Sequence, residues 1–165
     1  MALFPNTHPT PEELIAVNRS MEGQTPQKIV ETAIAEYGGT VILACSFGAE
    51  DVVLADMVFR SNPGSTLFYL DTDFLCPEPH PVRDRMIQHY QLKDDQIIRV
   101  KSKLSPSEQA TEFGEALWLR DPDQCCSLRK VEPLTRILAK YAAWITGIRR
   151  DQSPTRANAG IVEWD

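Results

Sequence analysis

From residue 40 onward, the hydrophobic positions form short continuous runs separated by longer segments with helical spacing. The runs cover residues 41–45, 66–70, 96–100 and 142–146. Continuous apolar runs of this length are typical of strands that are buried on both faces, because crossover helices cover a parallel sheet on each side. The pattern therefore predicts an α/β fold with a doubly wound, mostly parallel sheet.

Before the first run, apolar residues recur at the three- and four-residue spacing of helices. Two Thr-Pro pairs, at Thr10 and Thr25, are typical helix starts, and Gly38-Gly39 is a typical stop. We expect two N-terminal helices in a helical segment 1–39, followed by an α/β domain 40–165. Within that domain, helices are expected over 52–59 and 82–90, from Ser105 to a stop at Asp121-Pro122, and over 125–141 with a break at Pro133. The proline-rich stretch 76–81 is expected to be an extended loop.

Charge and composition narrow the classes of function. The 165 residues carry 17 Lys and Arg against 23 Asp and Glu, a net charge of −6. An acidic balance argues against general binding to nucleic acid or to a membrane surface. No apolar run reaches the length of a membrane span, and the first residues lack the features of a secretory signal, so we expect a cytoplasmic protein. In a reducing compartment, the adjacent Cys125 and Cys126 favour a reactive or ligating site over a disulfide.

Ligands of open parallel sheets bind beyond the carboxyl ends of the strands, which directs attention to the residues that follow each run. Residues 46–51 form a short Ser/Gly turn that leads into a helix, a geometry suited to a phosphate. Glu50 and Asp51 oppose an anion there, so ordinary helix-start residues remain an alternative interpretation. The other candidates at strand ends are Asp71, Thr72 and residues 147–151.

Five basic residues are concentrated after two of the predicted sheet elements: Arg129, Lys130, Arg149, Arg150 and Arg156. Guanidinium groups bind phosphate or sulfate bidentately, so these clusters predict an anion site, with a solvated charged face as the alternative. Nearby cations also favour the thiolate form of the cysteine pair, and thiolates ligate zinc or iron–sulfur clusters. Two thiolates need further donors, and a zinc site formed by Cys76, His80 and His89 has poor spacing.

Four segments resemble, in the same order, the thioredoxin-dependent adenylylsulfate and phosphoadenylylsulfate reductases of sulfate assimilation and cysteine biosynthesis. These segments are residues 46–54, 70–72, 125–134 and 146–153, and the resemblance spans residues 25–165. It implies an adenine-nucleotide α-hydrolase-like fold. It further implies an oxidoreductase whose cysteine thiolate attacks the sulfate sulfur, releasing AMP, after which thioredoxin or glutaredoxin releases sulfite.

The resemblance also implies roles for individual residues. Residues 46–51, namely Ser46, Phe47, Gly48, Ala49, Glu50 and Asp51, would hold the phosphosulfate, and Leu70, Asp71 and Thr72 would line the adenosine pocket. Gly147 and the five cations would surround the sulfate and phosphate. Cys125 and Cys126 resemble the first two ligands of a 4Fe–4S cluster, with Lys130 between cluster and substrate, and this pair marks the branch that prefers adenylylsulfate. No flavin or nicotinamide is expected, and a homo-oligomer is compatible with the resemblance.

The sequence departs from the family pattern in its cysteines. The second cysteine pair and the nucleophilic cysteine of the family are expected beyond Asp165, so we expect a chain that binds the nucleotide but is inactive alone. Two alternatives remain. One is a non-catalytic adenine-nucleotide binding module, and the other is an ATP-pyrophosphatase-like adenylating enzyme, whose usual Ser-Gly-Gly loop differs from this sequence at Phe47.

Overall fold

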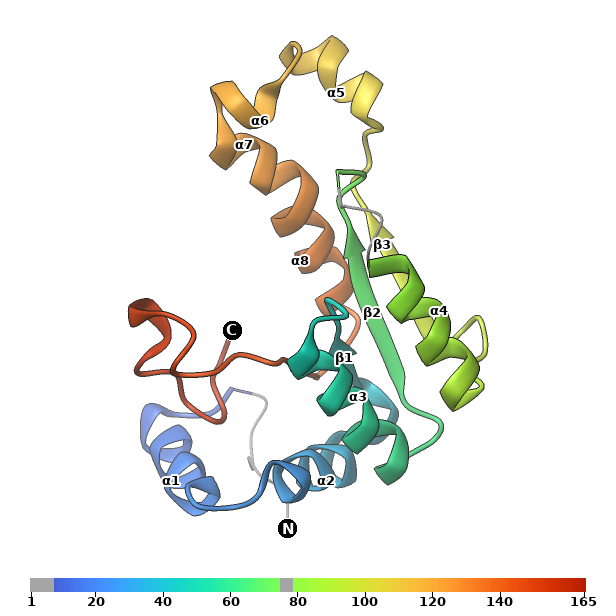
Figure 1. The fold of residues 1–165 in the computed structure, drawn as a ribbon. Helices are drawn as coiled ribbons and strands as arrows, with labels where there is room; N and C mark the ends of the chain where they lie inside the picture. The colour runs from blue at the N-terminus through green and yellow to red at the C-terminus, as the bar shows by residue number, and fades with distance from the viewer. Residues whose placement is uncertain (1–7, 75–78) are drawn as a thin grey trace.

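The computed structural model describes residues 8–74 and 79–165. Within these ranges, four parallel strands form one sheet in the order β3-β2-β1-β4 (Figure 1). The strands are β1 (Val41–Ala44), β2 (Thr66–Asp71), β3 (Ile97–Lys101) and β4 (Ala143–Ile145). Ile42 of β1 lies opposite Thr66 on one side and Trp144 on the other. The four strands predicted from the apolar runs are confirmed, each within one residue at either end.

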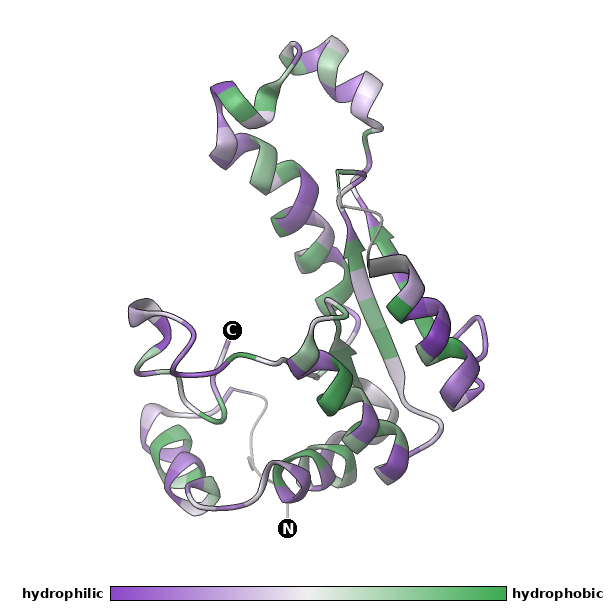
Figure 2. Cartoon of the chain, in the orientation of Figure 1, coloured by the Kyte–Doolittle hydropathy of each residue, from purple (hydrophilic) through white to green (hydrophobic). Residues whose placement is uncertain are grey.

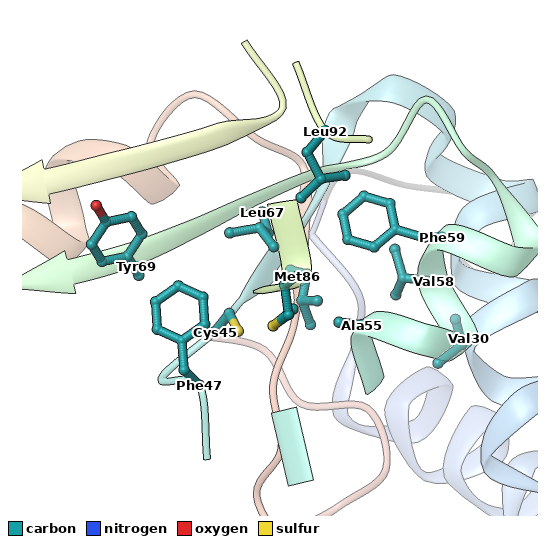
Figure 3. Packing of buried hydrophobic residues seen from close by; sticks show 11 residues of the cluster. Val30, Cys45, Phe47, Ala55, Val58, Phe59, Leu67, Tyr69, Met86 and Leu92 are labelled. Carbon is teal, nitrogen blue, oxygen red and sulfur yellow. The ribbon is translucent and has the colours of Figure 1, made fainter. Parts of the chain in front are cut away.

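Helices cover both faces of the sheet, as the continuous apolar runs predicted. On one face, Leu43 and Leu67 pack in a cluster with Val30, Ala55 and Met86. These three come from α2 (Pro26–Tyr37), α3 (Ala49–Ser61) and α4 (Pro79–Tyr90), and Figure 3 shows the cluster. On the other face, Ile42, Phe68 and Val100 pack with Ile137 of α8 (Glu132–Leu138). The strands are accordingly mostly hydrophobic in Figure 2, whereas α4 mixes hydrophilic and hydrophobic positions. The fold is therefore the expected doubly wound α/β type.

The two N-terminal helices begin and end where their caps predicted. Thr10 accepts a hydrogen bond from the Glu13 N–H at the start of α1 (Pro11–Met21), and Glu13 completes the capping box. Thr25 caps α2 in the same way. Gly38 follows α2 with φ 53°, in the left-handed region where glycine has no steric penalty. The chain then passes through η1 (Gly38–Thr40) into β1.

An arm of short helices connects β3 to β4. It comprises α5 (Pro106–Phe113), α6 (Leu117–Arg120), α7 (Pro122–Cys126), the π-helical turn η2 (Ser127–Val131) and α8. We expected Asp121 to close the helix that begins at Ser105, but the structure differs. Gly114 (φ 84°) ends α5, and the Asp121 side chain accepts from the Gln124 N–H at 3.0 Å and caps α7.

The two proline-based predictions have different outcomes. The boundary expected at Pro133 is confirmed within one residue, because η2 ends at Val131 and α8 begins at Glu132 with Pro133 in its first turn, where a missing N–H is tolerated. Residues 79–81 are not extended, because Pro79 begins α4 and prolines are well tolerated in a first helical turn. The rest of the expected loop, including Cys76, lies outside the described residues.

After β4, residues 146–165 contain the short helix η3 (Pro154–Arg156) and return toward α1 (Figure 1). None of the helices in the described ranges has the length and apolarity that a membrane-spanning segment needs.

Candidate functional site

The order of strands reverses at β1, because β2 and β3 lie on one side of it and β4 lies on the other. The carboxyl ends of β1 and β4 therefore flank the switch point at which open α/β sheets bind ligands. A cavity of about 370 Å³ lies there. Its lining consists of Ala44, Cys45, Ser46, Phe47, Glu50, Asp51, Phe68, Tyr69, Leu70, Leu134, Trp144, Thr146, Gly147, Ile148, Gln152 and Arg156.

The turn from β1 into α3 has an unusual backbone at Phe47. Its φ of 62° lies in the left-handed region, which disfavours residues with a side chain. The phenyl ring is buried and packs against Tyr69, with 5.2 Å between ring centroids (Figure 3). This packing stabilises a turn that delivers the chain to Gly48, the N-cap of α3, which offers no side chain to cap the helix. The first-turn N–H groups of α3 thus border the cavity without a side-chain cap.

Asp51 joins the loop after β1 to the loop after β4. Its Oδ2 accepts hydrogen bonds from the N–H and from the hydroxyl of Ser46, both at 2.6 Å. Its other oxygen lies against Gly147, where an added Cβ would stand 2.4 Å from Oδ1. The buried carboxylate therefore serves the geometry of the loops and requires glycine at position 147.

Glu50, the second acidic residue of the turn, is paired with a cation from the opposite loop. Arg149 Nη1 contacts Glu50 Oε1, and Arg149 Nε donates to Asp151 Oδ1 at 3.0 Å. The hydrogen bond and charge of Asp151, together with the charge of Glu50, raise the pKa of Arg149. Because each acidic residue of the turn already has a partner, the repulsion of an anion that the sequence suggested is reduced.

The polar end of the cavity is completed by the segment after β4. Arg156 Nη1 donates to Gln152 Oε1, and Gln152 Nε2 donates to the Gly147 carbonyl at 3.4 Å. The opposite walls are apolar, formed largely by Phe68, Leu70, Leu134, Trp144 and Ile148. The cavity therefore combines an apolar compartment with a polar end that carries a guanidinium group.

Of the residues expected in the adenosine pocket, Leu70 lines the cavity and the next two lie beside it. Asp71 and Thr72 are buried at the end of β2 and are absent from the lining. Asp71 accepts from Arg99 Nε at 2.6 Å and from the Asp73 N–H at 2.8 Å. Burial raises the pKa of Asp71, but the Asp73 N–H and the Arg99 charge outweigh it and hold the pKa below its ordinary value.

The structure separates the five predicted cations. Arg156 lines the cavity and Arg149 borders it through Glu50. Arg150 points away and forms a bidentate ion pair with Glu22, with N···O distances of 2.9 and 3.1 Å. Lys130 is exposed on η2 in the arm.

Arg129 is an internal residue of the arm, only 2% exposed. Its guanidinium donates to Gln109 Oε1 at 2.6 Å, to the Leu104 carbonyl at 2.9 Å and to Asp73 Oδ2 at 3.1 Å. Its Nη2 has no hydrogen-bond partner among the described residues. These contacts hold the arm to the ends of β2 and β3.

The cysteine pair ends α7, with Cys125 buried and Cys126 exposed, and both are free thiols. Gln109 Nε2 lies 3.8 Å from Cys125 Sγ. Two thiols suit two positions of a thiolate-ligated cluster, but no group of three or more His, Cys, Asp and Glu side chains forms in the described part of the chain. That also holds for the zinc alternative, whose Cys76 is outside the described residues. Burial raises the pKa of the Cys45 thiol to about 12, which suits neither a ligand nor a nucleophile.

Several lining residues were not singled out from the sequence. Thr146 and Gln152 lie within the segment 146–153 that carries the resemblance, so the motif itself was the available signal. Leu134 has the same signal in the segment 125–134, whereas Trp144 has none, because the direction of a side chain in a three-residue strand depends on the packed sheet.

Comparison with known proteins identifies the family to which the chain belongs. Residues 40–165 match the phosphoadenosine phosphosulfate reductase domain. The chain is 42% identical over 149 residues to adenosine 5′-phosphosulfate reductase of Halalkalibacterium halodurans, covering 90% of this chain and 64% of the relative. It is 42% identical over 148 residues to phosphoadenosine 5′-phosphosulfate reductase of Gloeobacter violaceus, covering 89% and 60%. The chain thus spans about three-fifths of the length of these curated relatives.

A solved structure agrees with the sequence match. The crystal structure of phosphoadenylyl-sulfate reductase from Candida auris, a phosphate complex, superposes with a TM-score of 0.74 at 25% identity, covering 88% of this chain and 71% of that one. The family model matches the whole α/β part of the chain, and the solved structure shares its parallel-sheet architecture. The chain therefore belongs to the phosphoadenosine phosphosulfate reductase domain family.

Proposed function

We propose that this chain is the nucleotide-binding part of a cytoplasmic, thioredoxin-dependent reductase that converts adenosine 5′-phosphosulfate (adenylylsulfate) to sulfite and AMP in sulfate assimilation. The observation that carries the proposal is the switch-point cavity, with its apolar walls and a polar end bearing Ser46, Gln152 and Arg156. The names of the relatives support the same chemistry.

The two ends of the cavity suit the two ends of such a nucleotide. Aromatic and aliphatic walls accept an adenine ring and ribose through apolar burial. A phosphosulfate carries its charge at the other end, where the uncapped N-terminus of α3 and the Arg156 guanidinium supply hydrogen-bond donors and positive charge. Residues 46–51, Leu70, Gly147, Arg149 and Arg156 form the binding set of this proposal. Asp71 and Thr72 support it from behind.

The remaining cations take other roles in the proposal. Arg129 positions the arm through its three hydrogen bonds, and Arg150 positions the segment after β4. Lys130 is exposed beside the cysteine pair, where it is available to a bound anion or cofactor.

Cys125 and Cys126 are proposed to supply two of the four thiolates of a 4Fe–4S cluster, with the other donors outside the described residues. When bound, such a cluster supplies redox-active iron whose properties depend on hydrogen bonds to its sulfur ligands. The described thiols include no suitable nucleophile, because Cys45 is buried with a raised pKa and the pair is assigned to the metal.

Calorimetric titration with adenosine 5′-phosphosulfate tests the nucleotide site. We expect saturable binding that Arg156→Ala weakens by roughly 10- to 100-fold, the loss of one charge-assisted contact. Arg85→Ala, an exposed arginine on α4, is the matched control and should leave binding unchanged. Equal affinity in the Arg156→Ala variant would contradict the site, and a preference for ATP with Mg²⁺ would favour an adenylating enzyme.

Anaerobic incubation with iron and sulfide tests the cofactor assignment. We expect the iron content and the absorbance near ~400 nm that thiolate-ligated iron gives to fall in Cys126→Ser. Cys45→Ser serves as the control and should retain both. Full iron content in Cys126→Ser would remove that residue from the ligand set, leaving a nucleotide-binding module without a cluster as the better description.

A further inference from the structure

The helix α1 lies beside the final segment of the chain, although the contacting residues are 128 to 144 positions apart in sequence (Figure 1). Within the described residues, every hydrogen bond or ion pair from α1 to a distant part of the chain reaches residues 150–162. His8, just before α1, also stacks edge-on with Trp164, with 5.2 Å between ring centroids. This helix therefore contacts the segment that follows β4 by specific polar groups.

Asn18 makes the most complete of these contacts. Its Oδ1 accepts from the N–H groups of Ile161 and Val162 at 2.7 and 3.1 Å. Its Nδ2 donates to the Val162 carbonyl at 2.7 Å and to the Leu14 carbonyl at 2.9 Å. The amide thus uses both donors and both acceptor positions, and it binds the backbone of Val162 as a neighbouring strand would. An added Cβ at Gly160 would stand 3.0 Å from Oδ1, so the approach also needs glycine there.

Glu22 provides a second contact, and its place at the end of α1 is not one that favours a negative charge. It is the C-cap of α1, where the helix dipole disfavours a negative charge. Its carboxylate instead binds both Nη atoms of Arg150, and Arg150 Nε donates to the Ala159 carbonyl at 2.8 Å. The Arg150 pair lowers the pKa of Glu22. Glu22 therefore stabilises the contact with the segment after β4, although its charge is unfavourable for its own helix.

The same segment carries the polar end of the cavity. Arg149 turns to Glu50 at the start of α3, while the next residue, Arg150, turns to Glu22 at the end of α1. Gln152 and Arg156, which line the cavity, lie between these anchors and the Asn18 contacts. Apart from the three residues of η3, this stretch has no regular structure, so its order depends on such side-chain anchors.

We propose that α1 is a clamp that holds residues 147–164 in place and pre-organises Gln152 and Arg156 for the ligand. Asn18 and Glu22 are then positioning residues, which do not touch the nucleotide. The effect on affinity rests on the proposed nucleotide site, whereas the effect on the segment does not. Ordering of the segment before binding reduces the conformational entropy lost on binding, which raises affinity without a new contact.

Hydrogen exchange in the absence of ligand tests the clamp itself. In Asn18→Ala we expect exchange to accelerate roughly tenfold at Ile161 and Val162 and in residues 147–156, with no change in β1 and β2. Asn18→Asp keeps the acceptor oxygens and should restore part of the protection. Glu22→Gln should loosen the 147–156 stretch with less effect at Val162, and Glu12→Gln, an exposed change on the same helix, is the control.

Titration with adenosine 5′-phosphosulfate then tests the link to the ligand. We expect Asn18→Ala and Glu22→Gln to weaken binding by roughly fivefold to tenfold, while Glu12→Gln matches the wild type. If Arg156→Ala weakens binding but both clamp variants bind normally, the proposed nucleotide site stands and the clamp is refuted. If the wild-type chain binds no nucleotide, the proposed function fails, and unchanged exchange at Gln152 and Arg156 would refute the clamp independently. If Asn18→Ala accelerates exchange in β1 as well, the substitution has loosened the fold as a whole, and Glu22→Gln is then the test. Faster exchange in residues 147–156 of Glu22→Gln supports the clamp, and unchanged exchange there refutes it.

Discussion

The contact between Gly147 and Asp51 makes the sharpest prediction for the site. In Gly147→Ala, the new Cβ would lie 2.4 Å from Asp51 Oδ1 and 3.3 Å from Glu50 Cβ. An ordinary carbon–oxygen contact is roughly 1 Å longer than the first of these distances, so the carboxylate or the backbone at position 147 must shift. The carboxylate is buried and holds Ser46 by two hydrogen bonds of 2.6 Å, so it has little room to move.

The expected loss follows from those two hydrogen bonds. Hydrogen bonds to a charged group contribute about 1.5–3 kcal/mol each, and the shift weakens both without removing them. Replacing glycine by alanine at an ordinary φ returns about 0.4–1 kcal/mol through the unfolded state. We expect the free energy of unfolding of Gly147→Ala to fall by about 1.5–3 kcal/mol, measured by urea denaturation.

Two further variants make the measurement specific. Gly39→Ala is the matched control, because an added Cβ there meets nothing within 4 Å, and its stability should not fall. In the Asp51→Ala background, Gly147→Ala should cost almost nothing more, since the atom that it meets has been removed. If Gly147→Ala alone is as stable as Gly39→Ala, or if its cost persists without Asp51, the interlock of the two loops is wrong.

Three more predictions concern groups near the site. Arg129→Met should lower the free energy of unfolding by about 2–4 kcal/mol, because Gln109 Oε1 and the Leu104 carbonyl lose their buried donor and Asp73 keeps only its ion pair with Lys101. Lys130→Met on the exposed side should change it by less than about 0.5 kcal/mol. The pKa of Asp71 is lower in the folded chain than its ordinary value of 3.8, so the stability that it contributes is complete above this value and is lost as the pH falls through the folded pKa. Asp71→Asn should therefore flatten the acid denaturation curve below pH 3.8. The control Asp94→Asn, at an exposed position, should leave that part of the curve unchanged. Peptide mapping after iodoacetamide treatment at about pH 8 should find the exposed Cys126 modified and the buried Cys45 protected until urea unfolds the chain. The reason is that burial raises the pKa of Cys45 to about 12. Rapid modification of Cys45 in the folded chain would contradict its burial.

The architecture was accessible from the sequence because its signals are local. Buried parallel strands need continuous apolar runs, and each of the four runs became a strand. Thr10, Thr25 and Gly38 fixed helix ends through short-range hydrogen bonds and backbone preferences, which tertiary contacts did not override. The stop expected at Asp121 is wrong for the helix from Ser105, because Gly114 with φ 84° already ends α5 and Asp121 caps α7 instead.

The site was less accessible, because the directions of side chains in loops depend on distant partners. Arg149 and Arg150 are adjacent and chemically identical, yet one pairs with Glu50 on α3 and the other with Glu22 on α1. Arg129 follows the cysteine pair in sequence but is internal, because Gln109 and Asp73 approach it from other elements. Clusters of charge therefore predicted that cations gather near the sheet, but they did not predict which of them line the cavity.

The two acidic residues of the turn illustrate how the same limitation affects the reading of an anion site. In sequence, Glu50 and Asp51 count against an anion at the start of α3, because carboxylates there repel it. In the structure, Asp51 accepts two hydrogen bonds from Ser46 and Glu50 is paired with Arg149, so each carboxylate is committed to joining the loop after β1 to the loop after β4. Arg156, which also lines the cavity, hydrogen-bonds to the neutral Gln152 and keeps its charge uncompensated in that contact. Within the described residues, Arg156 is therefore the guanidinium of the cavity that has no carboxylate partner and can meet an anion. Substituting Glu50 by glutamine should leave Arg149 paired with Asp151, and should therefore change the affinity for an anion less than Arg156→Ala does.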